Sequence, residues 1–511
     1  MYILSNLKFK GVIANLRIMK ISVFTVTTYL IIMVFILTIT AHAASGVSSA
    51  SDKYEQIDTI VREELAKANI PNSAIAIIQG EDAEYLFYPD ADCESTLDRH
   101  ALFQIGSVSK AYTGLGILLL EDEGLLSLDD PANKYLPWFT VSYEGKTVPP
   151  EELTIANLLY QTSGFTNDET KYPNASSGMS IEESVRQINE SELLFYPSQQ
   201  FAYANTNFRI LGLIIEIVSG QSYDAFMTEQ IQLPLGLENT YTDPQKAQNT
   251  GKVVGGSRLS FFQAWHYDVP VAAGNIPAGY IYSNISDMSR WLQIHMGEIE
   301  VSAQFQRIIE KSHQANPDSI VDDNTHYAAG WYINDETGGI YHSGGTPNYS
   351  ANVEIRTQSN IAVCILTNMN ASANTNSIAA NILNILEGKS TTPYQADVWS
   401  IFDLIFSSIT IIGAVGIFVL ILITLRLVRQ IRRVQREKVK VTRKRLLPFI
   451  PSSILTLFTI LAAVIIPIVF ESSWVDLVLW SPLSLLSGMI SLIVLSICAF
   501  GVSFITTIYK K

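Results

Sequence analysis

The chain of 511 residues is poor in cysteine and histidine, with three cysteines and seven histidines. Three cysteines cannot form the set of disulfides on which small secreted domains depend, and a chain of this length can bury a sufficient core without one. A bridge between Cys93 and Cys364 is possible if the fold brings the two together. Buried free thiols are the interpretation that we adopt.

Positive charge is scarce over most of the chain, and the formal net charge is -14. The segment Arg426–Arg445 is the exception, because it holds ten lysines or arginines and one acidic residue. The rest of the chain is therefore more acidic than the total suggests. This balance disfavours a nucleic-acid-binding surface, and we expect no nucleic-acid partner.

Long apolar runs, in contrast, are present at both ends. Residues 1–44 have a basic start, an apolar run over 21–39 and an Ala-His-Ala site that ends at residue 43. This order is typical of a secretory signal peptide with its cleavage site. Met19 is an alternative start, and an uncleaved membrane anchor is the alternative interpretation. We predict that residues 1–44 are a signal peptide.

Three apolar segments follow a short linker at 389–400. They cover about 401–425, 447–470 and 483–508, within a membrane region at 401–511, and each is long enough to cross a bilayer. The basic segment lies between the first two, whereas the loop after the second carries acidic residues. The positive-inside rule then places the basic segment and the C-terminus in the cytoplasm. We expect a multi-pass protein of the cell membrane whose residues 45–388 face outward.

Residues 45–388 have mixed composition and frequent turn signals, which indicates a globular domain. Strand patterns occur near both ends of this region, and the middle, roughly 100–315, is mostly helical. We therefore expect an α/β (α+β) fold in which a helical region is inserted into one sheet. The expected elements are helices at Asp52–Ala68 and Thr375–Leu386 and strands at Ser73–Gln79, Glu84–Tyr88, Ala328–Ile333, Ile340–His342, Asn352–Arg356 and Ala362–Asn368.

Ser107 and Lys110 form the first candidate catalytic pair. They follow Gly106 and lead into an apolar helix expected at 111–120. Residues three apart share a face of a helix, so the hydroxyl and the amine would lie together at its first turn. A helix N-terminus and a buried neighbourhood both favour a neutral lysine, which can take the serine proton. The spacing therefore predicts an activated serine nucleophile.

Two further motifs offer groups for the same chemistry. Tyr203 stands two residues before Asn205; a phenol near a cation can act as base and then acid, and a carboxamide can orient a substrate amide. His342 precedes Gly344 and Gly345, and glycines let a substrate backbone approach a strand edge. An N–H at that edge can complete an oxyanion hole with the N–H of the candidate serine. Each motif is short, so the hypothesis depends on their combination.

Together, these motifs resemble the three signature motifs of the serine β-lactamase and penicillin-binding-protein family, in its class C and DD-peptidase branch. The similarity covers roughly residues 52–388 and includes the segments 124–131, 153–164, 205–220, 277–287 and 327–331. The resemblance implies a β-lactamase/DD-peptidase-like antiparallel sheet flanked by helices, followed here by three transmembrane helices. The matching motifs are Ser107-Val108-Ser109-Lys110, Tyr203-Ala204-Asn205 and His342-Ser343-Gly344.

The resemblance also implies a role for each matching residue. Ser107 would be acylated with Lys110 as its proton partner, Tyr203 would be the general base, and Asn205 would bind the substrate amide. Gly345 would give the second oxyanion N–H, beside Gly344. His342 departs from the family pattern, since lysine is usual there and histidine is charged only part of the time near neutral pH. A second departure, Gln161 in place of a usual histidine, is expected to do no chemistry.

The function implied by the resemblance is acyl transfer through an acyl-serine on D-alanyl peptides or esters of the cell envelope, as in a D-Ala-D-Ala carboxypeptidase or a β-lactamase. We expect no cofactor or metal, because the sequence has no His-x-x-x-His pair, no His-x-His-x-Asp and no phosphate-binding glycine loop. The alternative is a non-catalytic membrane receptor that binds penicillin or peptidoglycan. A transporter is disfavoured because the three spans carry almost no internal charge.

Overall fold

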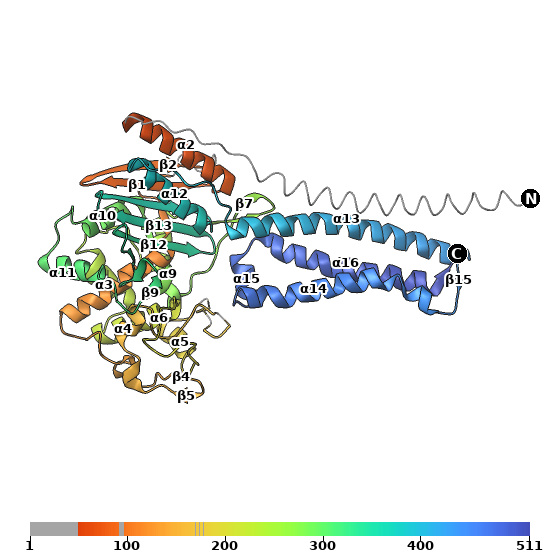
Figure 1. Cartoon of the computed structure of the whole chain (residues 1–511), viewed down its shortest axis with the longest axis horizontal. Helices are drawn as coiled ribbons and strands as arrows, with labels where there is room; N and C mark the ends of the chain where they lie inside the picture. Colours follow the sequence, from red (N-terminus) through yellow and green to blue (C-terminus); the bar gives the residue numbers. More distant parts are fainter. Residues whose placement is uncertain (1–49, 91–96, 169, 173, 177) are drawn as a thin grey trace, which may run out of the picture. The chain divides into compact units, whose positions relative to one another are not determined.

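The computed structural model describes residues 50–90, 97–168, 170–172, 174–176 and 178–511. The predicted signal peptide at 1–44 and Cys93 lie outside the described residues. The chain divides after Asp52, and Lys53–Lys511 forms one compact unit. This unit holds the sheet, the inserted helices and the apolar C-terminal helices (Figure 1).

An eight-stranded antiparallel sheet is the framework of the globular part, in the order β2-β1-β14-β13-β12-β11-β10-β9. Strand β1 (Ser73–Gln79) pairs along its length with β14 (Ile361–Thr367). Segments from the two ends of the globular part therefore lie side by side, as expected from the sequence. The other strands of this sheet are β2 (Asp82–Tyr88), β9 (Ile320–Asp322), β10 (Thr325–Tyr327), β11 (Tyr332–Asn334), β12 (Gly339–Thr346) and β13 (Tyr349–Arg356).

The two faces of the sheet bury separate apolar cores. Side chains alternate between faces along a strand. In β1, Ile75 and Ile77 belong to the core under α2 (Ala50–Ala68) and α12 (Ser372–Leu386), whereas Ala76 belongs to the larger core on the opposite face. Figure 1 shows α2 and α12 on the same side of the sheet. The larger core is the one that supports the candidate catalytic residues.

The helical region between β2 and β9 is organised around α3 (Ser109–Asp122). Every residue of α3 from Ser109 to Leu120 is buried, which explains why its sequence is apolar on all sides. The other helices are α4 (Ile155–Leu159), α5 (Ile181–Arg186), α6 (Asn205–Ser219), α7 (Tyr223–Phe226), α8 (Pro244–Asn249), α9 (Ile276–Gly279), α10 (Ile285–Met296) and α11 (Ala303–Ser312). Short pairs of strands are β3 (Leu102–Gln104) with β8 (Tyr282–Asn284), β4 (Ser142–Tyr143) with β5 (Lys146–Thr147), and β6 (Ser257–Ser260) with β7 (Gln263–His266).

The strand expected at Ala328–Ile333 is wrong, because a bend separates β10 from β11 there. Gly330 has a φ of +87°, and a Cβ at this position would lie 2.6 Å from the backbone of Lys110 and Ala111. The glycine lets the bend contact the start of α3, which a continuous strand could not do. Strand β12 in turn is longer than the expected Ile340–His342.

Three C-terminal helices are long and apolar enough to cross a membrane: α13 (Val398–Arg432), α14 (Phe449–Val469) and α16 (Leu483–Ile508). Helix α16 packs against both of the others, and the three run side by side in Figure 1. Large apolar side chains such as Ile412 and Phe418 are exposed on α13. A continuous apolar surface of this kind is typical of contact with lipid.

Two other features bear on the membrane region. The segment 471–482, expected to be a loop, contains a short helix, α15 (Trp474–Trp480). Helix α6 and the bent segment Tyr223–Gln232 are together also apolar enough to span a membrane. Their apolar side chains contribute to the larger core of the globular part, so packing within the domain accounts for them.

Candidate active site

Ser107 lies in a tight 3-10 turn, Gly106–Val108, that leads directly into α3. Gly106 has a φ of +52°, and a Cβ there would come within 2.6 Å of the backbone of Gly344. The hydroxyl of Ser109 donates to the carbonyl of Gly106 at 2.7 Å and accepts from the N–H of Ile281 at 3.1 Å. The turn is thus fixed from both sides, and Ser107 is partly exposed among buried neighbours.

Lys110 is fully buried one turn after the serine. Its Nζ lies 3.1 Å from Ser107 Oγ and donates to Asn205 Oδ1 at 2.7 Å and to the carbonyl of Ala278 at 2.6 Å. The rings of Tyr203 and Phe208 lie 4.8 Å and 5.6 Å from the same nitrogen. Burial lowers the pKa of Lys110 well below its usual range, which favours the neutral amine.

Tyr203 and Asn205 lie where the chain enters α6. Burial raises the pKa of the Tyr203 phenol well above its usual range, and a hydrogen bond to Ser107 offsets only part of this rise. The tyrosine is therefore a neutral phenol beside the serine. Asn205 is the first residue of α6, and its N–H donates to Asn167 Oδ1 at 3.0 Å while its side chain holds Lys110.

The backbone before Asn205 is fixed by Gln161. The fully buried Gln161 accepts the N–H of Ala204 at Oε1, 3.0 Å away, and the N–H of Ala202 at its backbone carbonyl, 2.8 Å away. Asn207 Nδ2 also donates to Gln161 Oε1, at 2.5 Å. Gln161 thus positions the Tyr203–Asn205 motif without taking part in the chemistry.

His342 lies on β12 and is buried among tyrosines. Its Nδ1 is 2.6 Å from the carbonyl of Ser343, so this nitrogen carries the proton, and Nε2 accepts from the hydroxyl of Tyr327 at 3.3 Å. Burial is the main cause that lowers the pKa of His342 to about 3, and Lys110 lowers it further whenever its amine is protonated. The sequence suggested a histidine charged part of the time near neutral pH, whereas the structure holds it neutral there.

Gly344 and Gly345 bring β12 into contact with the serine turn. A Cβ on Gly344 would come within 2.9 Å of the carbonyl carbon of Ile105, so the contact requires glycine. Strand β11 pairs with Gly339–Tyr341, and this pairing stops before His342. The pocket beside the serine is lined by Ser107, Asn174, Asn205, Asn275, Ala278, Gly279, Tyr280, Gly345 and Trp480.

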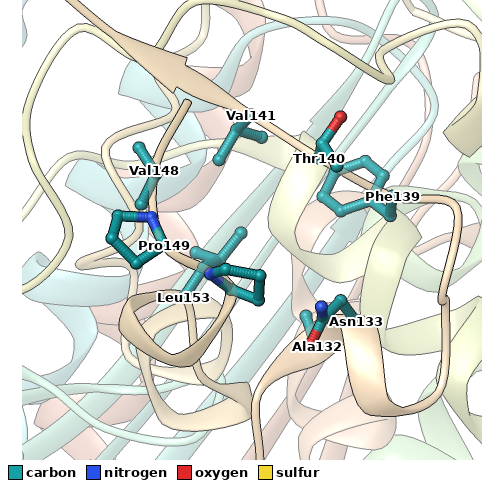
Figure 2. A pocket seen from close by; sticks show the side chains of 9 residues that line it. Ala132, Asn133, Phe139, Thr140, Val141, Val148, Pro149 and Leu153 are labelled. Carbon is teal, nitrogen blue, oxygen red and sulfur yellow. The ribbon is translucent and has the colours of Figure 1, made fainter. Parts of the chain in front are cut away.

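The predicted site residues therefore come from three distant segments and lie close together. Ser107, Asn205 and Gly345 line the pocket, whereas Lys110, Tyr203 and His342 lie behind this lining. Among the described residues, no group of three His, Cys, Asp or Glu side chains is placed to hold a metal ion. A separate hollow near α4 is shown in Figure 2. Its lining, which includes Phe139, Val148 and Leu153, contains no titratable side chain and shares no residue with the serine pocket.

This arrangement agrees with the comparison to known proteins. The chain belongs to the Beta-lactamase family, whose model matches residues 57–387. Protein flp of Staphylococcus aureus (strain COL) is 29% identical over 334 residues, which are 63% of this chain and 64% of that protein. The chain thus spans less than two thirds of the length of this relative.

Two further proteins extend the comparison. Penicillin-binding protein 4* of Bacillus subtilis is 26% identical over 58% of this chain and 68% of its own length. The octameric penicillin-binding protein homologue from Pyrococcus abyssi superposes with a TM-score of 0.56 at 23% identity, covering 69% of this chain and 81% of its own. The last match shows the shared fold, an antiparallel sheet flanked by helices.

Three residues that shape the site were not given a role in the sequence analysis. Ala278 acts through its backbone carbonyl, so its residue type carries no signal. Gln161 was noted only as a departure from the family pattern, although its buried carboxamide holds the Tyr203–Asn205 segment. Trp480 comes from the segment between two apolar helices, where nothing in the sequence connects it to Ser107.

Proposed function

We propose that the chain is a membrane-anchored serine hydrolase that forms an acyl-serine on Ser107 with D-alanyl peptides or esters of the cell envelope. The main support for this proposal is the environment of Lys110 Nζ. The nitrogen is buried, lies 3.1 Å from Ser107 Oγ and is held by two carbonyl oxygens. A lysine that is neutral and fixed beside a serine is the group needed to activate it.

The proton count at Lys110 fits this role. A neutral amine has two N–H donors and one lone pair. The two shorter contacts, 2.7 Å and 2.6 Å, lead to carbonyl oxygens that can only accept, so they take the two N–H groups. The lone pair then accepts the Ser107 hydroxyl. As Oγ attacks the substrate carbonyl carbon, the proton passes to Lys110, which becomes an ammonium with three acceptors in place.

Two backbone N–H groups are available for the negative charge that develops on the substrate oxygen. These belong to Ser107 and Gly345, which line the same pocket. Such donors are worth about 2.7–4 kcal/mol each in transition-state stabilisation. Collapse of the tetrahedral intermediate requires a proton on the leaving group. The neutral phenol of Tyr203 gives its proton and regains one from the Lys110 ammonium, and water later releases the acyl group by the reverse route.

The substrate preference follows from the neutral His342. A cation at this position would bind a free carboxylate, whereas an uncharged imidazole gives no such attraction. The edge of β12 after Tyr341 can pair with an extended substrate backbone, while Asn205 orients its amide. We therefore infer that esters, and amides without a terminal carboxylate, are favoured over D-Ala-D-Ala peptides and β-lactams.

Residues 45–388 form the hydrolase domain in this proposal, and the domain faces away from the cytoplasm. The signal-like segment at 1–44 and the basic segment between α13 and α14 both support this orientation. The cell-envelope substrate and the bilayer around the C-terminal helices are the proposed partners.

Active-site labelling of the full-length protein in detergent tests the proposal. We expect a fluorescent phosphonate to label the wild type and mass spectrometry to locate the adduct on Ser107. The variant Ser107→Ala should remain folded, with a stability change within about 1 kcal/mol, because little volume is lost. It should neither label nor hydrolyse a D-alanyl ester.

Two outcomes contradict the proposed function. Equal labelling of the folded Ser107→Ala variant would place the nucleophile elsewhere. A stable penicillin adduct on Ser107 without turnover of any ester or peptide would instead support a penicillin-binding receptor.

A further inference from the structure

The pocket beside Ser107 has one wall that does not belong to the hydrolase domain. Trp480, the last residue of α15, lines this pocket together with Ser107 and Gly345. Helix α15 connects α14 to α16, two of the three C-terminal helices that are long and apolar enough to span a membrane. The membrane region therefore completes the pocket.

Trp480 is held in place by a dedicated set of hydrogen bonds. The last carbonyls of a helix have no partner within it. At the end of α15, buried Arg258 donates to the carbonyls of Val478 at 3.0 Å and Ser481 at 3.5 Å. Tyr267 donates to the carbonyl of Leu479 at 3.2 Å, and Asn370 Nδ2 donates to that of Trp480 at 3.5 Å. Four successive carbonyls are thus bound by the hydrolase domain.

A second contact fixes the same domain to the helices. The backbone N–H groups of Phe261 and Phe262, at the tip of the β6–β7 hairpin, donate to Asp403 of α13 at 2.8 Å and 2.7 Å. Asp403 is only 1% exposed. The hydroxyl of Ser260 accepts the N–H of Leu483, the first residue of α16, at 2.7 Å. The hairpin therefore contacts two candidate spans at their domain-proximal ends.

These contacts also place the pocket near the domain-proximal ends of the candidate spans. Trp480 stands three residues before α16 begins at Leu483, and three residues reach about 10 Å at most. The headgroup layer is about 5–8 Å thick on each side of the hydrocarbon core. With Leu483 taken as the point where α16 enters the bilayer, Trp480 would lie in or just above that layer, where tryptophan is enriched in membrane proteins. The exposed rings of Phe261, Phe262 and Trp265 lie on the same hairpin that contacts the spans.

We propose that Trp480 contacts the substrate, and that the Ser107 pocket takes acyl esters or amides carried on a lipid-anchored molecule. This rests on the proposed function. Trp480 forms the wall of the pocket that faces the membrane. The lipid-anchored molecule that carries the acyl group would contact this wall while its lipid anchor stays in the bilayer. The C-terminal helices thereby select the substrate in addition to anchoring the enzyme.

The experiment compares two esters of the same acyl group on full-length protein in lipid nanodiscs. One ester has a short soluble alcohol, and in the other the alcohol is linked to a diacylglycerol lipid within the disc. We expect the wild type to prefer the lipid-linked ester at least about tenfold in kcat/KM, since a pocket at the headgroup layer meets it at high local concentration. In Trp480→Ala this preference should fall about tenfold, chiefly through KM, because the substrate loses its wall.

Controls separate substrate contact from folding. Trp480→Phe keeps an aromatic wall and should retain most of the preference. Val475→Ala, an exposed residue on the same helix, should leave both esters unaffected. Two results would show that Trp480 does not select the substrate. In the first, Trp480→Ala keeps the wild-type preference for the lipid-linked ester. In the second, Trp480→Ala slows hydrolysis of both esters and phosphonate labelling by the same factor, and Trp480→Phe does not restore these rates.

The wild-type measurements distinguish the two proposals. Absence of phosphonate labelling at Ser107 would overturn the proposed function itself. Normal labelling together with equal kcat/KM for the two esters would leave the hydrolase intact and overturn only the lipid-linked substrate.

Discussion

Lys110 is surrounded by oxygen atoms of uncharged groups: a serine hydroxyl, the carboxamide of Asn205 and the carbonyl of Ala278. None of these partners is a carboxylate that would hold the lysine as a cation. Burial therefore determines its charge, and the amine is neutral until it takes a proton. The catalytic assignment depends on this feature of the site.

The first prediction concerns the loss of that amine. Lys110→Met keeps most of the side-chain volume but cannot accept a proton, so we expect phosphonate labelling of Ser107 to slow by about 10²–10⁴-fold. Stopped-flow or time-course labelling gives the rate. Lys134→Met removes an exposed lysine paired with Asp130 and should label like the wild type. Labelling of Lys110→Met within threefold of the wild type would remove the lysine from the mechanism.

The second prediction concerns pH. Because the pKa of Lys110 is lowered and its neutral form is the active one, kcat/KM should rise with pH through that pKa and be lost on the acid side. His342, with a pKa of about 3, stays neutral over the neutral range and should not contribute a step near pH 6.5. In His342→Gln the acid limb should therefore keep its midpoint, whatever the change in rate. If the midpoint of the acid limb in the kcat/KM profile of His342→Gln moves by a full pH unit, His342 and not Lys110 is the group that titrates there.

At the scale of elements, the site depends on the close approach of β12 to the serine turn. Gly106 and Gly344 meet backbone to backbone, which aligns Gly345 with Ser107 in the same pocket. The register of β12 with β13, in which Gly345 faces Ser350, sets where along the strand this contact falls. A shift by one residue would turn the strand's side chains to the opposite face.

The third prediction tests this contact with a matched pair of glycines. Gly106→Ala should lower stability by about 1–3 kcal/mol from overpacking, in addition to the cost of its positive φ, and should abolish most labelling. Gly220→Ala also carries a positive φ of +68°, but a Cβ there meets no atom within 4 Å. It should cost only about 1–2 kcal/mol and leave labelling intact. Denaturant melts provide the stabilities, and equal effects at the two positions would contradict the steric account.

At the scale of the whole molecule, the hydrolase domain and the C-terminal helices share one interface, in which the β6–β7 hairpin contacts α13, α15 and α16. The positive charge at the C-terminal end of α13 indicates how the protein is oriented in the membrane. Ten basic residues lie in Arg426–Arg445, between two apolar helices, and such a segment resists translocation.

The fourth prediction is that residues 426–445 face the cytoplasm. A cysteine introduced at Lys440 should not react with an impermeant maleimide in intact cells and should react after permeabilisation. A cysteine at Glu336, on the hydrolase domain, should react in both cases. Labelling of the Lys440→Cys variant in intact cells would reverse the topology.

The sequence by itself determined the features that depend on neighbouring residues. Apolar runs of sufficient length predicted the three C-terminal helices, and strand patterns between turn signals predicted β1, β13 and β14 to within a few residues. The Ser107-to-Lys110 spacing predicted a shared face because helical geometry relates such positions locally. The order of three short motifs pointed to the family, which the match over 57–387 confirms.

The tertiary structure decided what depends on residues far apart in the chain. The bend at Gly330 replaces an expected strand because α3 passes beneath it, and no local pattern reports that contact. The neutral state of His342 arises from its surroundings, since the same imidazole in water would titrate near pH 6.5. Trp480 lines the Ser107 pocket, and the carbonyls of residues 478–481 are bound there by side chains from distant segments. The burial of His342 and the contacts of Gly330 and Trp480 result from the packing of distant segments. Local sequence patterns do not report such contacts.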